Sequence, residues 1–338
     1  MRLAVIGAGA VGSNVARLAA DHGHSVVALA DSSSAVVADT SSVTDSSSAA
    51  AGIDVEAALA RKRRGEGLGP ADPADALAAA YDALIEATPT TLGDAEPGWS
   101  HVEHALARDK HVVLANKGPV AERYADLRAA ERESGGRVAM EATVAGAIPV
   151  HATLSDLGPA SVAAVRGVLN GTANFVLSRM ATEGLAYDHV LAEAQDLGVA
   201  EADPSFDVNG TDAALKCVIL ANRLLDARTD DPALLRERAF SLADAAVEGI
   251  GDVPGGALQL AREDGRTVRL VGEATPERVR VGPRLVPEGS PLAVSGTRNV
   301  VEIDADHAGE LALSGKGAGG EATASAVLAD VNRLAREH

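Results

Sequence analysis

The sequence contains very few lysines. Only five of its 30 basic residues are lysine, namely Lys62, Lys110, Lys117, Lys216 and Lys316, whereas Asp and Glu number 48 and the formal net charge is −18. Such a charge repels nucleic-acid phosphates and anionic lipids, so we expect no nucleic-acid or membrane partner. An acidic surface with little lysine favours a halophilic protein, because high salt screens self-repulsion. A genomic bias toward Ala and Arg codons explains the same composition.

Cysteine, aromatic residues and long apolar runs are also scarce. The single cysteine, Cys217, excludes an intramolecular disulfide and a multi-cysteine metal site. Aromatic residues make up 2%, so the cores must consist of Ala, Val, Leu and Ile. No apolar run suffices to span a membrane, and the N-terminus shows no signal-peptide pattern. We therefore expect a soluble, cytoplasmic protein, whose 338 residues suit two domains.

The first 31 residues have the pattern of a βαβ unit. An apolar run over residues 3–6 ends at Gly7, residues 13–20 favour a helix, and a second apolar run over residues 26–30 ends at Asp31. The connecting turn has the spacing G-x-G-x-x-G, whose glycines permit a tight turn, close approach of a pyrophosphate and close helix packing. We expect this loop to bind a dinucleotide rather than to be a simple turn, through Gly7, Gly9, Ala10, Val11 and Gly12.

The choice between NAD and NADP stays open at this stage. Asp31 follows the glycine loop by about 20 residues, where an acidic side chain accepts hydrogen bonds from the adenosine ribose and favours NAD. Ser32 to Ser34 could instead donate to a 2′-phosphate, and the basic run Arg61 to Arg64 could supply positive charge. Residues 31–48 are rich in Ser and weakly patterned, which predicts a loop or a poorly ordered stretch.

The remaining pattern predicts an α/β protein with a Rossmann-type, doubly wound parallel sheet and an inserted α+β domain. In the first part we expect strands at 83–85 and 111–115 and helices at 53–64 and 102–108. In the second part we expect strands at 162–169, 279–286 and 299–303 and helices at 174–183 and 212–225. A last helix at 323–336 returns to the first part. The predicted domains are 1–138 plus 304–338 for the dinucleotide and 139–303 for catalysis and dimerisation.

A cluster of carboxylates precedes one of the few lysines. Glu201, Asp203, Asp207 and Asp212 lead to Lys216, and the last two are four residues apart on one face of a largely apolar helix. A lysine held beside carboxylates near a cofactor can donate a proton to a carbonyl. The alternative, an exposed ion pair, fits such an apolar helix less well. Lys117 follows a predicted strand at the edge where ligands bind.

Other segments are less specific. Residues 170–174 (Asn-Gly-Thr-Ala-Asn) cap a helix or face a substrate, and the carbonyl-rich loop 141–149 could hold a hard cation, although a simple turn explains it better. Residues 315–320 form a second glycine-rich turn, either a hinge or a cover for the cofactor. His101 and His104 share a helix face without a third ligand, so we interpret them as solvated rather than metal-binding.

Taken together, these motifs resemble the homoserine dehydrogenase family over nearly the whole chain. The resemblance rests on the order and spacing of segments 7–12, 86–90, 93–97, 115–119, 141–149, 170–174, 201–216 and 314–320. It implies hydride transfer between NAD or NADP and L-aspartate 4-semialdehyde, which gives L-homoserine for threonine, methionine and isoleucine biosynthesis. It further implies that Lys216 donates the proton, that Asp212 positions it, and that Lys117 contacts substrate and nicotinamide. The implied substrate-binding residues are Glu201, which binds the amino group, Asp207, Thr172 and Lys117.

The resemblance adds cofactor and cation ligands. Lys62, Thr88, Lys117 and Gly319 are expected to join Asp31 and the glycine loop in binding the dinucleotide. A sodium ion is implied, bound by the Glu141 side chain and the main-chain carbonyls of Val144, Gly146 and Ile148. Family members pair through the second domain, which implies a homodimer.

Two departures and two rival functions complete this interpretation. The chain ends after its last helix without a regulatory or kinase domain, so we expect no feedback by threonine through such a domain. The Ser-rich stretch after Asp31 is atypical and bears on the cofactor choice.

One rival function is another amino-acid or semialdehyde dehydrogenase on the same scaffold. A phosphorylating aldehyde dehydrogenase needs a cysteine nucleophile, whereas Cys217 lies in an apolar helix with no adjacent His, which argues against that enzyme. The other is a non-catalytic NAD(P)-binding regulatory protein, which needs no lysine–carboxylate site.

Overall fold

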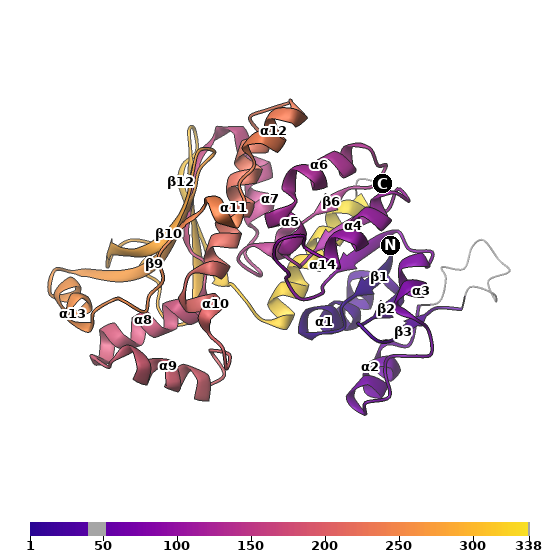
Figure 1. Ribbon diagram of the computed structural model, residues 1–338, viewed down its shortest axis with the longest axis horizontal. Helices are drawn as coiled ribbons and strands as arrows, with labels where there is room; N and C mark the ends of the chain where they lie inside the picture. Colours follow the sequence, from indigo (N-terminus) through magenta and orange to yellow (C-terminus); the bar gives the residue numbers. More distant parts are fainter. Residues whose placement is uncertain (40–51, 337–338) are drawn as a thin grey trace. The chain divides into compact units, whose positions relative to one another are not determined.

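The chain folds into two compact units in a computed structural model that describes residues 1–39 and 52–336 (Figure 1). Unit 1 comprises Met1–Gly146 and Gly319–His338, and unit 2 comprises Ala147–Ala318. Each unit has its own six-stranded sheet. The mixed α/β architecture with a Rossmann-type sheet and an inserted domain is therefore confirmed.

The sheet of unit 1 has the strand order β3-β2-β1-β4-β5-β6. Its strands are β1 (Arg2–Ile6), β2 (Ser25–Ala30), β3 (Ala35–Val37), β4 (Ala83–Glu86), β5 (His111–Leu114) and β6 (Val138–Ala139). All neighbours pair in parallel except β3, which is antiparallel to β2. The strand order reverses between β1 and β4, and ligands of doubly wound folds bind at such a switch point.

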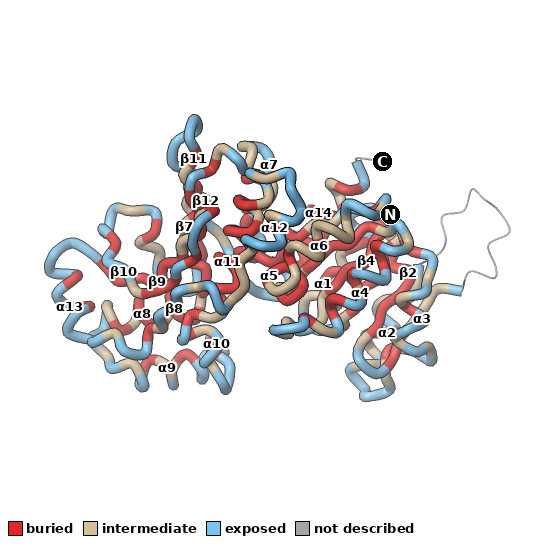
Figure 2. Tube along the Cα trace, turned by 45° about the horizontal axis from the view of Figure 1, so that its top comes forward, coloured by how far each residue is buried: buried red, intermediate tan, exposed pale blue. Residues whose placement is uncertain are grey.

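Helices cover the strands of unit 1. They are α1 (Ala10–Leu18), α2 (Val55–Arg63), α3 (Pro73–Ala78), α4 (Gly98–Leu106), α5 (Gly118–Glu122), α6 (Tyr124–Arg132) and α14 (Gly320–Arg336). Val15 of α1 and Val327 and Val331 of α14 share one buried cluster with Leu3 and Val5 of β1. The predicted return of the last helix to the first part of the chain is confirmed. Figure 2 shows the strands of this unit as a continuous buried centre.

The sheet of unit 2 has the order β12-β11-β7-β9-β10-β8 and is antiparallel except between β8 and β10. Its strands are β7 (Val162–Val168), β8 (Ala246–Val247), β9 (Arg266–Ala274), β10 (Val279–Pro287), β11 (Arg298–Ala305) and β12 (Gly309–Lys316). Its helices are α7 (Val150–Leu157), α8 (Gly171–Glu183), α9 (Tyr187–Asp196), α10 (Ser205–Val208), α11 (Thr211–Asp226), α12 (Pro232–Arg238) and α13 (Gly255–Glu263). Helix α11 lies close against β9, because a Cβ on Gly272 would come within 2.4 Å of Cys217 Sγ.

Two expectations change at the level of elements. Part of the predicted Ser-rich loop forms β3, since Ala35 to Val37 pair with β2; residues 40–51 lie outside the described part of the chain. The units divide at 146/147 and 318/319, rather than at 138/139 and 303/304. Strand β12 lies in unit 2 because its backbone pairs with β11 from Arg298↔Lys316 to Ala305↔Gly309. Among the described helices, none is both long and apolar enough to cross a membrane.

Candidate active site

The glycine loop between β1 and α1 has the geometry of a phosphate cradle. Gly7 has φ +107°, and a Cβ there would lie 2.3 Å from Ala87 O. A Cβ on Gly12 would lie 1.8 Å from Gly7 O, whereas one on Gly9 meets nothing within 4 Å. The first and third glycines are therefore required by packing, and the second faces open space. Helix α1 begins at Ala10 with no side-chain cap, so its first N–H groups remain for an anion.

Asp31 and Lys62 form an ion pair after β2. Lys62 Nζ lies 2.7 Å from Asp31 Oδ2, and Asp31 Oδ1 accepts hydrogen bonds from the backbone and hydroxyl groups of Ser33 and Ser34. Burial by itself raises the pKa of Asp31, but the hydrogen bonds from Lys62 and Ser33 outweigh it and hold the pKa well below its ordinary value. The carboxylate that would accept from a ribose is thus already paired with the lysine that would contact a 2′-phosphate.

Lys62 differs from the arginines of its basic run. Arg61 and Arg64 both contact Glu66 and are engaged locally. Lys62 instead reaches back to the end of β2. The sequence alone could not select which member of the run reaches Asp31, because the answer depends on how α2 lies against β2.

A buried carboxylate joins the two loops that follow β4 and β5. Glu86 is 0% exposed and accepts hydrogen bonds from Thr88 N at 3.0 Å, from Thr88 Oγ1, and from Asn116 Nδ2 at 3.3 Å. Its other oxygen lies 2.7 Å from His101 Nδ1 of α4. The interpretation of His101 as solvated is therefore wrong. A buried carboxylate needs hydrogen-bond donors, and the position of Glu86 at the end of an apolar strand already indicated in the sequence that it is buried.

The loop after β5 places Lys117 at the N-cap of α5. Lys117 N lies 3.4 Å from Thr90 Oγ1, and Asn116 Oδ1 accepts from Gly118 N at 2.9 Å. The backbone around Lys117 is therefore tied through Asn116 to Thr88 and Glu86. Lys117 and Thr88 thus lie on neighbouring loops at the carboxyl ends of β4 and β5, as predicted for the ligand-binding edge.

Unit 2 contains a buried lysine–carboxylate pair on α11. Lys216 is 6% exposed and Asp212 7% exposed, and Lys216 Nζ lies 2.6 Å from Asp212 Oδ2. Lys216 Nζ also donates to Leu169 O at 2.6 Å. An ammonium group has three N–H donors, so one remains without a partner in the described structure. The alternative of an exposed ion pair is therefore wrong.

Asn170, which the sequence predicted to cap a helix or face the substrate, also organises the surroundings of this pair. Its Oδ1 accepts from Ala173 N and caps α8, while its Nδ2 donates to Asp207 Oδ1 at 2.7 Å and to Asp212 Oδ2 at 2.9 Å. One amide thereby connects two predicted site carboxylates. Asn299 of β11, which the sequence did not single out as a site residue, donates to Leu169 O at 2.9 Å, the carbonyl that also accepts from Lys216.

The other predicted substrate residues in unit 2 differ in their exposure. Thr172 is 8% exposed and its hydroxyl donates to Val199 O at 3.1 Å. Glu201 is exposed, and its main-chain carbonyl accepts from Gln195 Nε2. Of the predicted catalytic residues, Lys117 belongs to unit 1, and Asp212 and Lys216 belong to unit 2.

Glu141, the predicted cation ligand, lies in a cluster of charges with α14. Its carboxylate is 3.3 Å from Arg333 Nη1, and its backbone N–H donates to Asp330 Oδ2 at 2.7 Å. Burial raises the pKa of Asp330 to about 7. Val144 and Gly146 follow in unit 1, whereas Ile148 belongs to unit 2 and its carbonyl accepts from Val150 N. Arg333 already supplies a positive charge to the one carboxylate of the set.

Cys217 is inert in this structure. It is buried, and burial raises the pKa of its thiol to about 12. A thiol that stays protonated is a poor nucleophile, so the argument against a cysteine-dependent aldehyde dehydrogenase stands. Within the described residues, no group of three or more His, Cys, Asp or Glu side chains is arranged to hold a metal.

Comparison with known proteins assigns the chain to a family. Residues 149–331 match the family model described as homoserine dehydrogenase, and residues 7–141 match the model of its NAD-binding domain. The chain belongs to the homoserine dehydrogenase family. The family predicted from the sequence, and with it an NAD(P)-dependent oxidoreductase, is confirmed, which sets aside a non-catalytic protein.

Individual relatives match over most of their length. A homoserine dehydrogenase of Methanocaldococcus jannaschii is 34% identical over 98% of this chain and 97% of its own. An NAD(+)-dependent homoserine dehydrogenase of Pseudomonas canavaninivorans is 38% identical over 74% of this chain and 70% of its own. The crystal structure of a putative homoserine dehydrogenase from Archaeoglobus fulgidus superposes with a TM-score of 0.85 at 38% identity, covering 99% of both chains.

Proposed function

We propose that this chain interconverts L-aspartate 4-semialdehyde and L-homoserine, with Lys216 as the proton donor, in the pathway to threonine, methionine and isoleucine. The bound nicotinamide supplies or accepts the hydride. The observation that carries the proposal is the buried ammonium of Lys216, two of whose N–H groups are held by Asp212 and Leu169 O. The third can donate to the aldehyde oxygen as hydride reaches the carbonyl carbon. In reverse, the neutral amine accepts the hydroxyl proton of homoserine.

The neighbouring side chains orient the substrate and the lysine. Asp212 holds the ammonium and is itself held by Asn170. We assign Asp207, Thr172 and Glu201 to the substrate, with the carboxylate of Glu201 on its amino group, and Lys117 to both substrate and nicotinamide. These assignments rest on the family resemblance together with the link through Asn170, whose Nδ2 donates both to Asp207 and to Asp212, the partner of Lys216.

The cofactor site of the proposal lies in unit 1. Gly7, Gly9, Ala10, Val11 and Gly12 receive the pyrophosphate, and Gly319, with φ +113°, precedes the α14 terminus beside them. A Cβ on Gly320 would lie 2.9 Å from Ala10 O, which supports an approach of that turn to the cradle. Thr88 and Lys117 lie at the nicotinamide end. The Asp31–Lys62 pair serves either cofactor: Asp31 accepts from the ribose of NAD, and Lys62 turns to the 2′-phosphate of NADP.

A cofactor-reduction assay tests this function. Homoserine with NAD or NADP should give reduced nicotinamide, followed by its absorbance, from low salt to molar KCl. Retained activity at molar KCl supports a halophilic enzyme, because screening relieves the repulsion of the −18 charge. Absence of homoserine-dependent reduction at every salt concentration would refute the enzymatic proposal.

We also propose a sodium ion at Glu141 with the carbonyls of Val144, Gly146 and Ile148. Glu141 is 2% exposed, and a buried carboxylate requires positive charge nearby. Arg333 meets part of this need, so the guanidinium and a sodium ion would compete for the Glu141 carboxylate. Thermal unfolding in NaCl and in choline chloride distinguishes them. Equal stability in both salts, for the wild type and for Arg333→Met, would argue against sodium.

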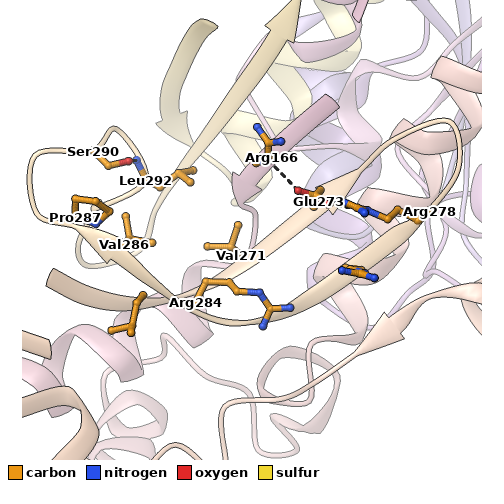
Figure 3. Close-up of a pocket in the computed structure, with 11 residues that line it drawn as sticks. Arg166, Val271, Glu273, Arg278, Arg284, Val286, Pro287, Ser290 and Leu292 are labelled. Atoms are coloured by element: carbon orange, nitrogen blue, oxygen red, sulfur yellow. Dashed lines mark hydrogen bonds and ion pairs between the residues drawn. The ribbon is translucent and has the colours of Figure 1, made fainter. Parts of the chain in front are cut away.

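We propose that the chain forms a homodimer through the open face of the unit 2 sheet. Side chains alternate along β9, so Val271 points away from α11, toward which Gly272 faces. There Val271 clusters with Val168, Val286, Leu292 and Val300. Figure 3 shows Val271, Val286 and Leu292 of this cluster together with the ion pair between Arg166 Nε and Glu273 Oε2, which are 2.9 Å apart.

A self-complementary pair of such faces suits a two-fold dimer, because the partly exposed, oppositely charged Arg166 and Glu273 can then meet their counterparts on the second copy. Sedimentation velocity tests this assembly. Arg166→Glu and Glu273→Arg should each weaken the dimer, and the double charge swap should restore it. Unchanged sedimentation of both single variants would remove this face as the interface.

A further inference from the structure

A polar cavity of about 360 Å³ lies in unit 2, between the start of β9 and helices α8 and α13. These three elements contact one another and lie side by side in Figure 1. The cavity is lined by Ser178, Ala181, Thr182, Arg262, Thr267, Arg269, Glu288, Ala293 and Ser295. It shares no residue with the glycine loop or the lysine–carboxylate site described above.

Arg269 is the central observation. It is 5% exposed, yet within the described part of the chain no carboxylate lies within ion-pair distance of its guanidinium. Its Nε donates to Val294 O at 2.6 Å, and its Nη1 donates to Thr267 Oγ1 at 2.7 Å and to Val268 O at 2.8 Å. These acceptors are all neutral, and Nη2 has no hydrogen-bond partner among the residues described. Burial of a charge without a counterion is costly, and a bound anion would remove that cost.

Other groups of the cavity favour an anion. Thr267 Oγ1 accepts from Arg269, so its own hydroxyl proton is available to a ligand beside Nη2. Arg262, anchored by its Nη1 to Ala181 O at 2.8 Å, adds a second positive charge at the rim. Glu288 is the only carboxylate of the lining, and it is exposed. Two arginines against one glutamate give a positive cavity in a protein whose net charge is strongly negative.

We propose that this cavity binds a small oxyanion, a carboxylate or a phosphate, between Arg269 Nη2 and the Thr267 hydroxyl. A guanidinium with an adjacent hydroxyl donor is suited to either group. The ligand binds away from the proposed reaction site, so the cavity is a separate site for a small anionic metabolite.

Thermal unfolding at constant ionic strength tests the proposal, with sodium phosphate and sodium acetate each replacing sodium chloride. A saturating dinucleotide is present, so that the glycine loop cannot contribute, and each series is repeated without it. For the wild type we expect a saturable rise in Tm of about 2–4 °C when the anion is several-fold above its Kd. The anion that gives the larger shift in Tm shows whether the acid group of the ligand is a phosphate or a carboxylate.

The variants locate the effect. Thr267→Val is nearly isosteric and should remove most of the shift while the protein remains folded; Arg269→Met should abolish it. Arg238→Ala removes an exposed arginine of α12 and serves as the matched control with the full shift. If Thr267→Val and Arg269→Met keep the wild-type shift, or if neither anion gives a shift beyond that of chloride, the proposal is overturned.

Discussion

Replacing Lys216 with Met separates its chemical and structural contributions. Met keeps a long apolar side chain but removes the ammonium, and it leaves Asp212 buried with Asn170 Nδ2 as its donor. Both members of the pair are more than nine-tenths buried, so the loss belongs to the class of broken buried ion pairs. We expect the free energy of unfolding to fall by about 3–5 kcal/mol. For a unit of this size, this corresponds to a decrease in Tm of about 6–20 °C.

The double variant Lys216→Met with Asp212→Asn removes both charges. The Asn carbonyl can still accept from Asn170, so we expect most of the lost stability to return. Activity should not return: kcat for homoserine oxidation should be lower by about 10²–10⁴-fold in both variants, the usual contribution of a general acid–base. Lys110→Met is the matched control, because Lys110 is partly exposed and has no role in the proposed site. This variant should keep a near-wild-type kcat.

The assay combines chemical denaturation with steady-state kinetics below the melting temperature of each variant. Undiminished kcat in Lys216→Met would refute the proton-donor role whatever its stability. A double variant as unstable as the single one would show that the charge of Asp212, separated from the ammonium, is not the cause of the loss.

The remaining predictions concern unit 1. Lys62→Ala should lower kcat/KM with NADP by about tenfold and change kcat/KM with NAD little, because a hydrogen bond from a partly exposed lysine has an energy at the lower end of the charge-assisted range. Asp31→Ala should lower mainly kcat/KM with NAD. Equal effects of either variant on both cofactors would contradict the assignment. Glu86→Ala leaves His101 and the loop after β4 without their buried acceptor and should raise KM for the dinucleotide more than for homoserine, alongside a loss of about 2–4 kcal/mol in the free energy of unfolding. Burial raises the pKa of Asp330 from 3.8 to about 7, so between these pH values the folded state binds one proton more than the unfolded state. The stability that this group contributes is therefore full below pH about 4 and declines as the pH rises toward 7. Chemical denaturation from pH 4 to 8 should show that decline in the wild type and not in Asp330→Asn.

The local elements and the dinucleotide loop could be predicted from the sequence, because the information lies within short segments. The period of apolar residues located four strands of unit 1 and the strands β7, β10 and β11 of unit 2, but it missed β9 and β12. The glycine spacing after β1 depends in part on the contact between Gly7 and Gly12, which are close in the chain. The Asp212–Lys216 pair was predictable for the same reason, since a four-residue spacing places both side chains on one helix face. The apolar neighbours of Lys216 also indicated that the pair is buried.

Groups that meet only through the tertiary structure were not predictable. Asn170 reaches Asp207 and Asp212 from 37 and 42 residues away, and His101 reaches Glu86 from a different element. The pairing of β12 with β11, rather than a return to the first unit after residue 303, likewise depends on backbone hydrogen bonds that no side-chain pattern specifies. The sequence by itself therefore determined the kind of chemistry, through residue types at helical and turn spacing. Only the tertiary structure decided which carboxylates are buried and which amide, imidazole or guanidinium compensates each one, because burial and pairing depend on the packing of distant elements.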